Sequence, residues 1–85
     1  MSATESNFLA LIVKAENDFL NIENNLSASR VPWDTVCYHA QQAAEKLLKA
    51  FVVHHGQAVP RTHDLVALLA RCSQFEPSLE SLAED

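Results

Sequence analysis

The chain has 85 residues, of which 48% are apolar, with one glycine, three prolines and a net charge of −5. A chain of this length forms one small domain with a modest core, and this composition excludes disordered and low-complexity classes. No apolar run approaches the roughly 20 residues that a membrane span needs, and the N-terminus lacks the basic start of a secretory signal, so we expect a cytoplasmic protein without membrane contact.

The first predicted helix runs from Thr4 to Leu26. Apolar residues recur along it at steps of three and four and form one narrow stripe, whereas the opposite face is acidic and is expected to be solvated. The stripe consists of Phe8, Ile12, Ala15, Phe19, Ile22 and Leu26. The segment from Ser27 to Pro32 is expected to connect this helix to the next.

The second predicted helix follows Pro32 and extends to about His55. Pro32 and Asp34 are typical of a first helical turn, and Gly56 is expected to supply the left-handed residue of a helix C-cap. Its apolar residues cover an arc of about 120°, which is wide enough to meet two neighbouring helices. The arc comprises Val36, Cys37, Ala40, Ala43, Ala44, Leu47, Leu48 and Phe51. This is therefore the central helix, and its alanines permit the close approach of a partner helix.

A third helix and a short last helix complete the predicted fold. Thr62 is expected to be the N-cap of the third helix, with Asp64 in its first turn. Its apolar stripe consists of Leu65, Leu68, Leu69 and Cys72. From Pro77 the sequence is typical of a short, acidic helix. The pattern as a whole predicts an all-α protein, a small antiparallel bundle of three main helices and a short C-terminal one.

The two cysteines, Cys37 and Cys72, are expected to be reduced and buried. In a hairpin that turns near residues 56–62, Cys37 lies about 25 Å from the turn and Cys72 about 13 Å. A disulfide needs Cα atoms within about 7 Å of each other. The cysteines and the four histidines also lack the short paired spacing of a zinc site, so no metal or other cofactor is predicted.

The polar face of the second helix is the candidate functional site. Tyr38, Gln42, Glu45 and Lys49 fall within about 60° of one another, with Gln41 and Lys46 beside them and His39 at the boundary with the apolar arc. The loop residues Arg61, His63 and Asp64 are expected to converge on the same region. An aromatic ring, an amide, a carboxylate and several cations suit a recognition surface. The alternative is an ordinary solvated face with surface pairs at i,i+4.

The stretch YHAQQAAEKLLKAFVVHHG, followed after a short gap by RTHDL, resembles the HEPN family, the higher eukaryotes and prokaryotes nucleotide-binding domain. The resemblance covers most of residues 8–75. It implies an α-helical bundle that forms homodimers and works with a minimal nucleotidyltransferase, in some cases as a toxin–antitoxin pair. The family's pattern falls on His39, Gln41, Gln42, Glu45, Lys46, Lys49, His63, Asp64 and Leu65.

Two departures from the family's pattern bear on activity. Ribonuclease members carry an arginine followed by a histidine after four to six intervening residues, but Arg30, Arg61 and Arg71 have no histidine at that spacing. The resemblance also implies that residues 1–85 are a single HEPN-like domain, which we expect to lack the family's last long helix. The resemblance therefore implies a non-catalytic binding module, with a ribonuclease toxin as the alternative.

The charge distribution narrows the choice of partners. The net charge of −5 disfavours sequence-independent binding to nucleic acid, which relies on neutralising phosphates. Residues 30–71, however, hold five bases against three acids, whereas residues 72–85 hold four acids and no base. The positive segment suits either a nucleotide phosphate or RNA end near Arg61, Lys46 and Lys49, or an acidic partner protein.

Overall fold

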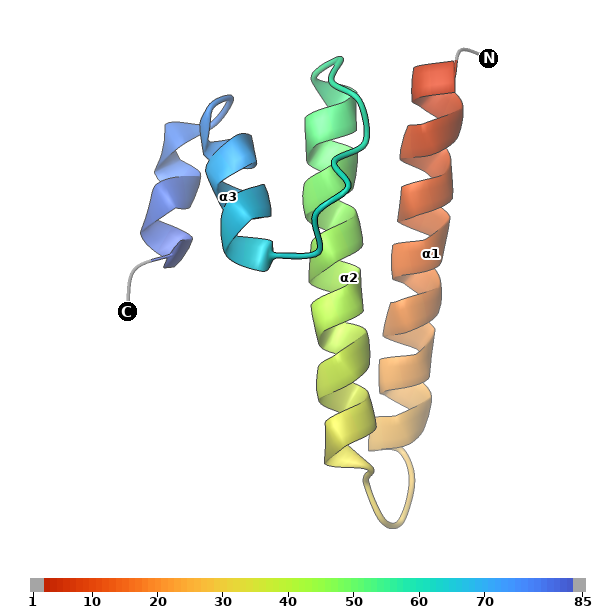
Figure 1. Cartoon of the computed structure of the whole chain (residues 1–85). Coiled ribbons are helices and arrows are strands. Elements are labelled where there is room, and N and C mark those ends of the chain that lie inside the picture. Colours follow the sequence, from red (N-terminus) through yellow and green to blue (C-terminus); the bar gives the residue numbers. More distant parts are fainter. Residues whose placement is uncertain (1–2, 84–85) are drawn as a thin grey trace.

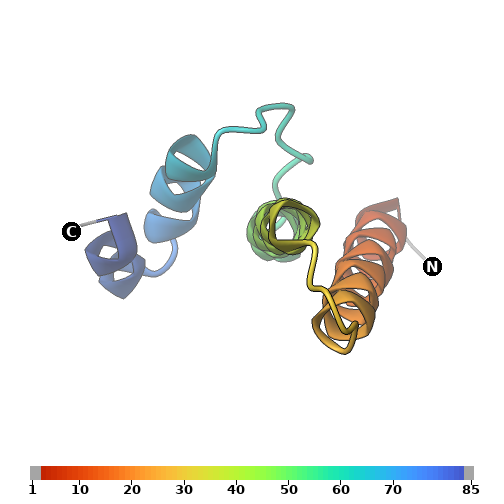
Figure 2. The same ribbon diagram turned by 90° about the horizontal axis from the view of Figure 1, so that it is seen from below.

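The computed structural model describes residues 3–83, and all of the regular secondary structure within them is helical. It contains α1 (Ala3–Leu26), α2 (Trp33–His54), α3 (Leu65–Ser73) and the 3₁₀-helix η1 (Pro77–Ala83). Helices α1 and α2 form a long antiparallel hairpin, and α3 and η1 lie on the other side of α2 beside its C-terminal half (Figure 1). Figure 2 shows α2 in the middle, between α1 and α3. The prediction of an all-α bundle with a central second helix is confirmed.

Small residues line the seam between α1 and α2. Ala15 on α1 is 1% exposed, and Ala43 and Ala50, which lie seven residues apart on one face of α2, are both 2% exposed. Small side chains let two helix backbones approach closely. The predicted stripe of α1 is only partly buried, since Phe19 and Leu26 are about half exposed. The buried face of α1 is rotated away from them, toward Asp18, which is 4% exposed.

The two ends of α2 follow the sequence signals closely. Pro32 occupies the position just before the first helical residue, and Asp34 lies in the first turn. At the other end Gly56 has a φ of +83°, and its N–H donates a 2.9 Å hydrogen bond to the carbonyl of Val53. A positive φ favours glycine over any residue with a Cβ. The predicted glycine C-cap is confirmed.

Residues 57–64 form a linker that runs back along α2 before α3 begins (Figure 1). Pro60 in its middle is buried. No backbone–backbone hydrogen bond involves residues 58–63, all of which the structure describes. Side-chain contacts must therefore hold this segment against the helix.

The N-cap of α3 differs from the prediction. Asp64, and not Thr62, caps the helix, because its Oδ1 accepts hydrogen bonds from the N–H groups of Val66 at 2.9 Å and Ala67 at 3.4 Å. The Thr62 hydroxyl lies two residues earlier and accepts from the N–H of Asp64 at 3.1 Å. Asp64 still has extended backbone angles, so the first helical residue is Leu65. Within α3, Leu68 and Cys72 are fully buried, and Leu65 and Leu69 are half-buried.

The two cysteines are free, as predicted, but only one of them is buried. The thiol of Cys72 donates to the carbonyl of Leu48 at 3.3 Å. Burial raises the pKa of the Cys72 thiol, although the charge of Arg71 opposes this effect. The prediction that Cys37 is buried is wrong. Cys37 lies near the start of α2, and α3 and η1 cover only the other half of that helix (Figure 1).

None of the helices described is long and apolar enough to cross a membrane.

Candidate functional site

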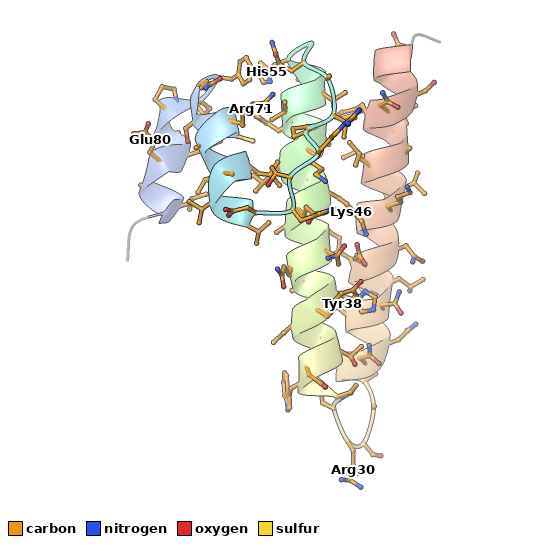
Figure 3. All side chains as sticks on the ribbon, in the orientation of Figure 1. Arg30, Tyr38, Lys46, His55, Arg71 and Glu80 are labelled. Carbon is orange, nitrogen blue, oxygen red and sulfur yellow. The ribbon has the colours of Figure 1, made fainter. Side chains whose placement is uncertain are left out.

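Asp18 on α1 is shared by two side chains of α2. His39 donates from Nδ1 to Oδ1 at 2.8 Å, and Lys46 donates from Nζ to Oδ2 at 2.5 Å. His39 and Lys46 are seven residues apart, so they lie on the same face of α2. Both bind Asp18 of α1, so this face is turned toward α1, and Figure 3 labels Lys46 on that side. We call Asp18, His39 and Lys46 the Asp18 cluster. It ties the two long helices together across their seam.

The Asp18 cluster keeps its carboxylate ionised. Burial alone raises the pKa of Asp18, because it disfavours the charged form. The hydrogen bonds from Lys46 and His39, together with their charges, outweigh burial and hold the pKa of Asp18 below its usual range. At neutral pH the cluster therefore contains a negative charge that is matched by a lysine within the seam.

Glu45 on α2 forms the second such cluster. It is 6% exposed, its Oε2 lies 3.4 Å from Nζ of Lys49, and its Oε1 accepts from Nδ1 of His63 at 3.0 Å. Lys49 is itself 7% exposed. We call Glu45, Lys49 and His63 the Glu45 cluster. The expectation that Glu45 and Lys49 lie on a solvated face is wrong, because the linker folds over this face of α2 and covers it.

Both clusters fix the orientation of an imidazole ring. An ionised carboxylate only accepts hydrogen bonds, so Nδ1 of His39 and of His63 carries the proton, and Nε2 of the neutral ring is left as an acceptor. The side chain of His39 is 20% exposed and that of His63 is 80% exposed. A carboxylate-oriented imidazole is a suitable proton acceptor or hydrogen-bond acceptor for a ligand. Residues 3–83 contain no group of three or more side chains placed to bind a metal ion.

The remaining predicted site residues are distributed around these clusters. Tyr38 is 56% exposed, and its ring meets the His39 ring edge-on at a centroid distance of 5.2 Å. Gln42 is half-buried, Arg61 is exposed, and Asp64 caps α3. The structure thus brings Tyr38, His39 and Lys46 together, and separately Glu45, Lys49 and His63. It does not place all of the predicted site residues on one exposed face.

Sequence reasoning missed Asp18, although a signal for it exists. Asp18 follows Ala15 by three residues and precedes Ile22 by four, so it shares the helical face of two apolar residues. An acid at such a position is buried only where cations compensate it, and Lys46 and His39 supply that compensation. The predicted apolar stripe includes Phe19, one residue away, and this placement puts Asp18 outside the stripe.

A groove of about 490 Å³ between α2, α3 and η1 was also missed. Ala44, Leu47 and Leu48 form its α2 wall; Leu65, Val66, Leu69 and Leu82 line the rest of it. Val66 and Leu82 are 68% and 70% exposed. The sequence pattern indicated that most of these residues are core. The groove exists because α3 packs on α2 through Leu68 and Cys72 and turns Val66 outward.

Comparisons with known proteins identify one family. The family model of the HEPN domain matches residues 8–85 of the chain. No curated protein and no solved structure matches it.

Proposed function

Because the chain belongs to the HEPN domain family, we propose that it is a binding module without RNA-cleaving activity, which acts as a homodimer together with a nucleotidyltransferase-type protein. The exposed apolar surface is the observation that supports the homodimer. Among the residues described, eleven large apolar side chains are exposed, whereas only seven apolar residues are fully buried, and three of those are alanines. A core this small leaves the domain marginally stable on its own, and association buries further apolar surface.

The half of α2 that carries no α3 is the proposed homodimer contact. Trp33 is 63% exposed, and Cys37 and Ala40 are exposed on the same arc of the helix. Small residues beside a large aromatic ring allow a second helix to approach closely and to bury the ring. A second copy of this chain offers the same surface, as a two-fold contact requires.

The oligomeric state tests the homodimer. We expect light scattering at micromolar concentration to give the mass of a dimer. Ala40→Glu introduces a charge into the contact and should raise the dimer dissociation constant by about tenfold or more. Ala10→Glu, the same change at an exposed position of α1, should leave it unchanged. A monomer whose melting temperature does not depend on concentration would contradict the homodimer.

The partner is tested by co-purification from the native host, with the bound protein and any bound nucleotide identified. The proposal expects a nucleotidyltransferase-type protein. Nucleotide or RNA is proposed as a further ligand, in contact with the exposed Arg61 and with Nε2 of His63, because Lys46 and Lys49 are occupied by Asp18 and Glu45. If the chain is recovered only with copies of itself, the proposal of a nucleotidyltransferase-type partner is contradicted.

The alternative function is that of a ribonuclease toxin. One observation favours it, namely the two imidazoles that carboxylates orient with Nε2 free. Against it stands the spacing of the three arginines, none of which has a histidine after four to six intervening residues. We expect highly purified protein not to cleave RNA. Metal-independent cleavage that is abolished by His39→Ala or His63→Ala would favour the toxin instead.

A further inference from the structure

The only tryptophan of the chain and the α2 wall of the groove between α2, α3 and η1 lie on one stripe of α2. We propose that in the homodimer Trp33 of each copy docks in the groove of the other copy. This inference rests on the proposed homodimer and adds to it the residue that each copy contributes to the groove of the other.

An exposed stripe of apolar and small residues runs along α2 from its first residue into the groove. Its members follow one another at steps of four and three residues, the spacing that keeps side chains on one helical face. They are Trp33, Cys37, Ala40, Ala44 and Leu47. Trp33 is 63% exposed and Leu47 is 40% exposed. The stripe contains no charged residue, so the net charge of −5 on each copy acts on this contact only at long range, where salt screens it.

The other faces of the C-terminal half of α2 are already in contact with the rest of the chain. Lys46 binds α1, the Glu45 cluster holds the linker, and Cys72 of α3 contacts the carbonyl of Leu48. At 100° per residue Leu47 lies between Lys46 and Leu48, so the stripe faces outward between α1 and α3. Figure 2 shows these two helices on different sides of α2. A second helix can therefore pack on the stripe without displacing α1, the linker or α3.

The C-terminal part of the stripe forms a hole for a large side chain. Four residues of α2 have the spacing i, i+3, i+4 and i+7 that surrounds a side chain inserted from a facing helix. They are Ala44, Leu47, Leu48 and Phe51. Toward α3 the hole continues into the groove of about 490 Å³, whose far wall includes Val66 and Leu82, both largely exposed. An indole ring has a large apolar surface to bury, and the groove offers it aliphatic walls on both sides.

A two-fold axis at Ala40 brings this hole and Trp33 together. Trp33 lies seven residues before Ala40 and Leu47 lies seven residues after it, so two antiparallel copies of α2 that cross at Ala40 place each Trp33 level with Leu47 of the other copy. The small side chains of Cys37, Ala40 and Ala44 lie near the crossing, where the two backbones approach most closely. A parallel crossing would set one indole ring against the other and leave both grooves open. The antiparallel crossing therefore fills two grooves with two rings.

Substitutions at the ring and in the groove should be coupled. Trp33→Ala alone, and Val66→Ser together with Leu82→Ser, should each raise the dimer dissociation constant by at least about tenfold. All three changes together should raise it little further, because either change alone already removes the contact. Since Trp33 lies about 21 Å along α2 from Leu47 of its own chain, this coupling can arise only between copies. Val13→Ser, at a 61% exposed position of α1, is the matched control and should leave the dissociation constant unchanged.

Mixing two variants shows which residue enters which groove. One variant keeps Trp33 and carries Val66→Ser with Leu82→Ser, two changes at exposed positions outside the core. The other variant carries Trp33→Ala and an intact groove, so it contains no tryptophan. On mixing we expect the tryptophan emission to shift to shorter wavelength, because the ring of the first variant enters the intact groove of the second. A third variant, which combines Trp33→Ala with both groove substitutions, is the control and should cause no shift.

The outcomes separate the docking of Trp33 from the homodimer itself. A shift with the intact groove and none with the substituted groove supports the docking. No shift with the intact groove, the same shift with both, or additive effects on the dissociation constant would overturn it and leave the homodimer in place. A chain that stays monomeric at micromolar concentration would contradict both. If the groove substitutions leave the dimer unchanged but release a nucleotidyltransferase-type protein, the groove binds that partner and the docking is wrong.

Discussion

On each of two faces of α2 a carboxylate binds a histidine and a lysine, but the two faces pack against different kinds of neighbour. On one face Asp18 accepts from His39 and Lys46, and on the other Glu45 accepts from His63 and Lys49. The Asp18 cluster joins two long helices that already pack along their length. The Glu45 cluster joins α2 to a linker whose residues 58–63 have no backbone–backbone hydrogen bond. Similar chemistry therefore reinforces a seam in one place and holds an otherwise unsupported segment in the other.

The two clusters differ in solvent exposure and therefore in their expected contribution to the free energy of unfolding. The His39 side chain is 20% exposed and that of His63 is 80% exposed. A pair that is open to water on one side is screened and contributes little, whereas a buried charge that loses its partner costs several kcal/mol. Substitutions in the Asp18 cluster should therefore affect global stability, and those at His63 should affect mainly the linker.

The largest effect is expected from Asp18→Ala, which leaves Lys46 and His39 without their carboxylate. We expect the free energy of unfolding in urea, at fixed protein concentration, to fall by about 3 kcal/mol. Glu16→Ala, two residues away on the exposed face of α1, should change it by less than about 0.5 kcal/mol. A loss below about 1 kcal/mol for Asp18→Ala would mean that the seam depends on its apolar contacts alone.

A smaller, pH-dependent effect is expected from Asp18→Asn. Since the folded chain holds the pKa of Asp18 below that of the unfolded chain, the unfolded state binds the proton first, and stability falls as pH drops below about 4. At neutral pH the asparagine variant should be about 1 to 2 kcal/mol less stable. This difference should hold above about pH 5 and shrink at lower pH. A difference that stays constant down to pH 2 would show that Asp18 does not titrate with folding.

The smallest effect on global stability is expected from His63→Ala. Because His63 is largely exposed, the free energy of unfolding should fall by less than about 1 kcal/mol. Amide hydrogen exchange at Asp64, Val66 and Ala67, whose N–H groups bind the side chains of Thr62 and Asp64, should nevertheless become faster, since the linker loses its contact with Glu45. Gln57→Ala, at the exposed start of the linker, serves as the control. Unchanged exchange in the His63 variant would show that Pro60 and its apolar neighbours hold the linker without Glu45.

The sequence was sufficient to predict the helices but not to predict which polar residues are buried between the segments. The 3.6-residue period, Pro32 and Gly56 locate α1 and α2 within a residue or two, because these signals act within one element. The burial of Glu45 and Lys49 depends on a linker that returns along α2, and no local pattern predicts its path. Asp18 differs, because its helical face with Ala15 and Ile22 is a local signal, but the partners that compensate its charge lie 21 and 28 residues away in the chain. Residues that are polar in the sequence can be interior when another segment covers them.

The contact between Cys72 and Leu48 makes the chain its own reporter of partial opening. Cys37 is exposed and should react with a thiol reagent in the native state, whereas Cys72 is buried against α2 and has a raised pKa, so that it reacts only after α3 separates from that helix. The rate at which the second thiol becomes labelled then measures how often α3 leaves its place. A ligand in the groove between α2 and α3 would slow the labelling of Cys72 without altering the labelling of Cys37, so that Cys37 serves as the internal reference.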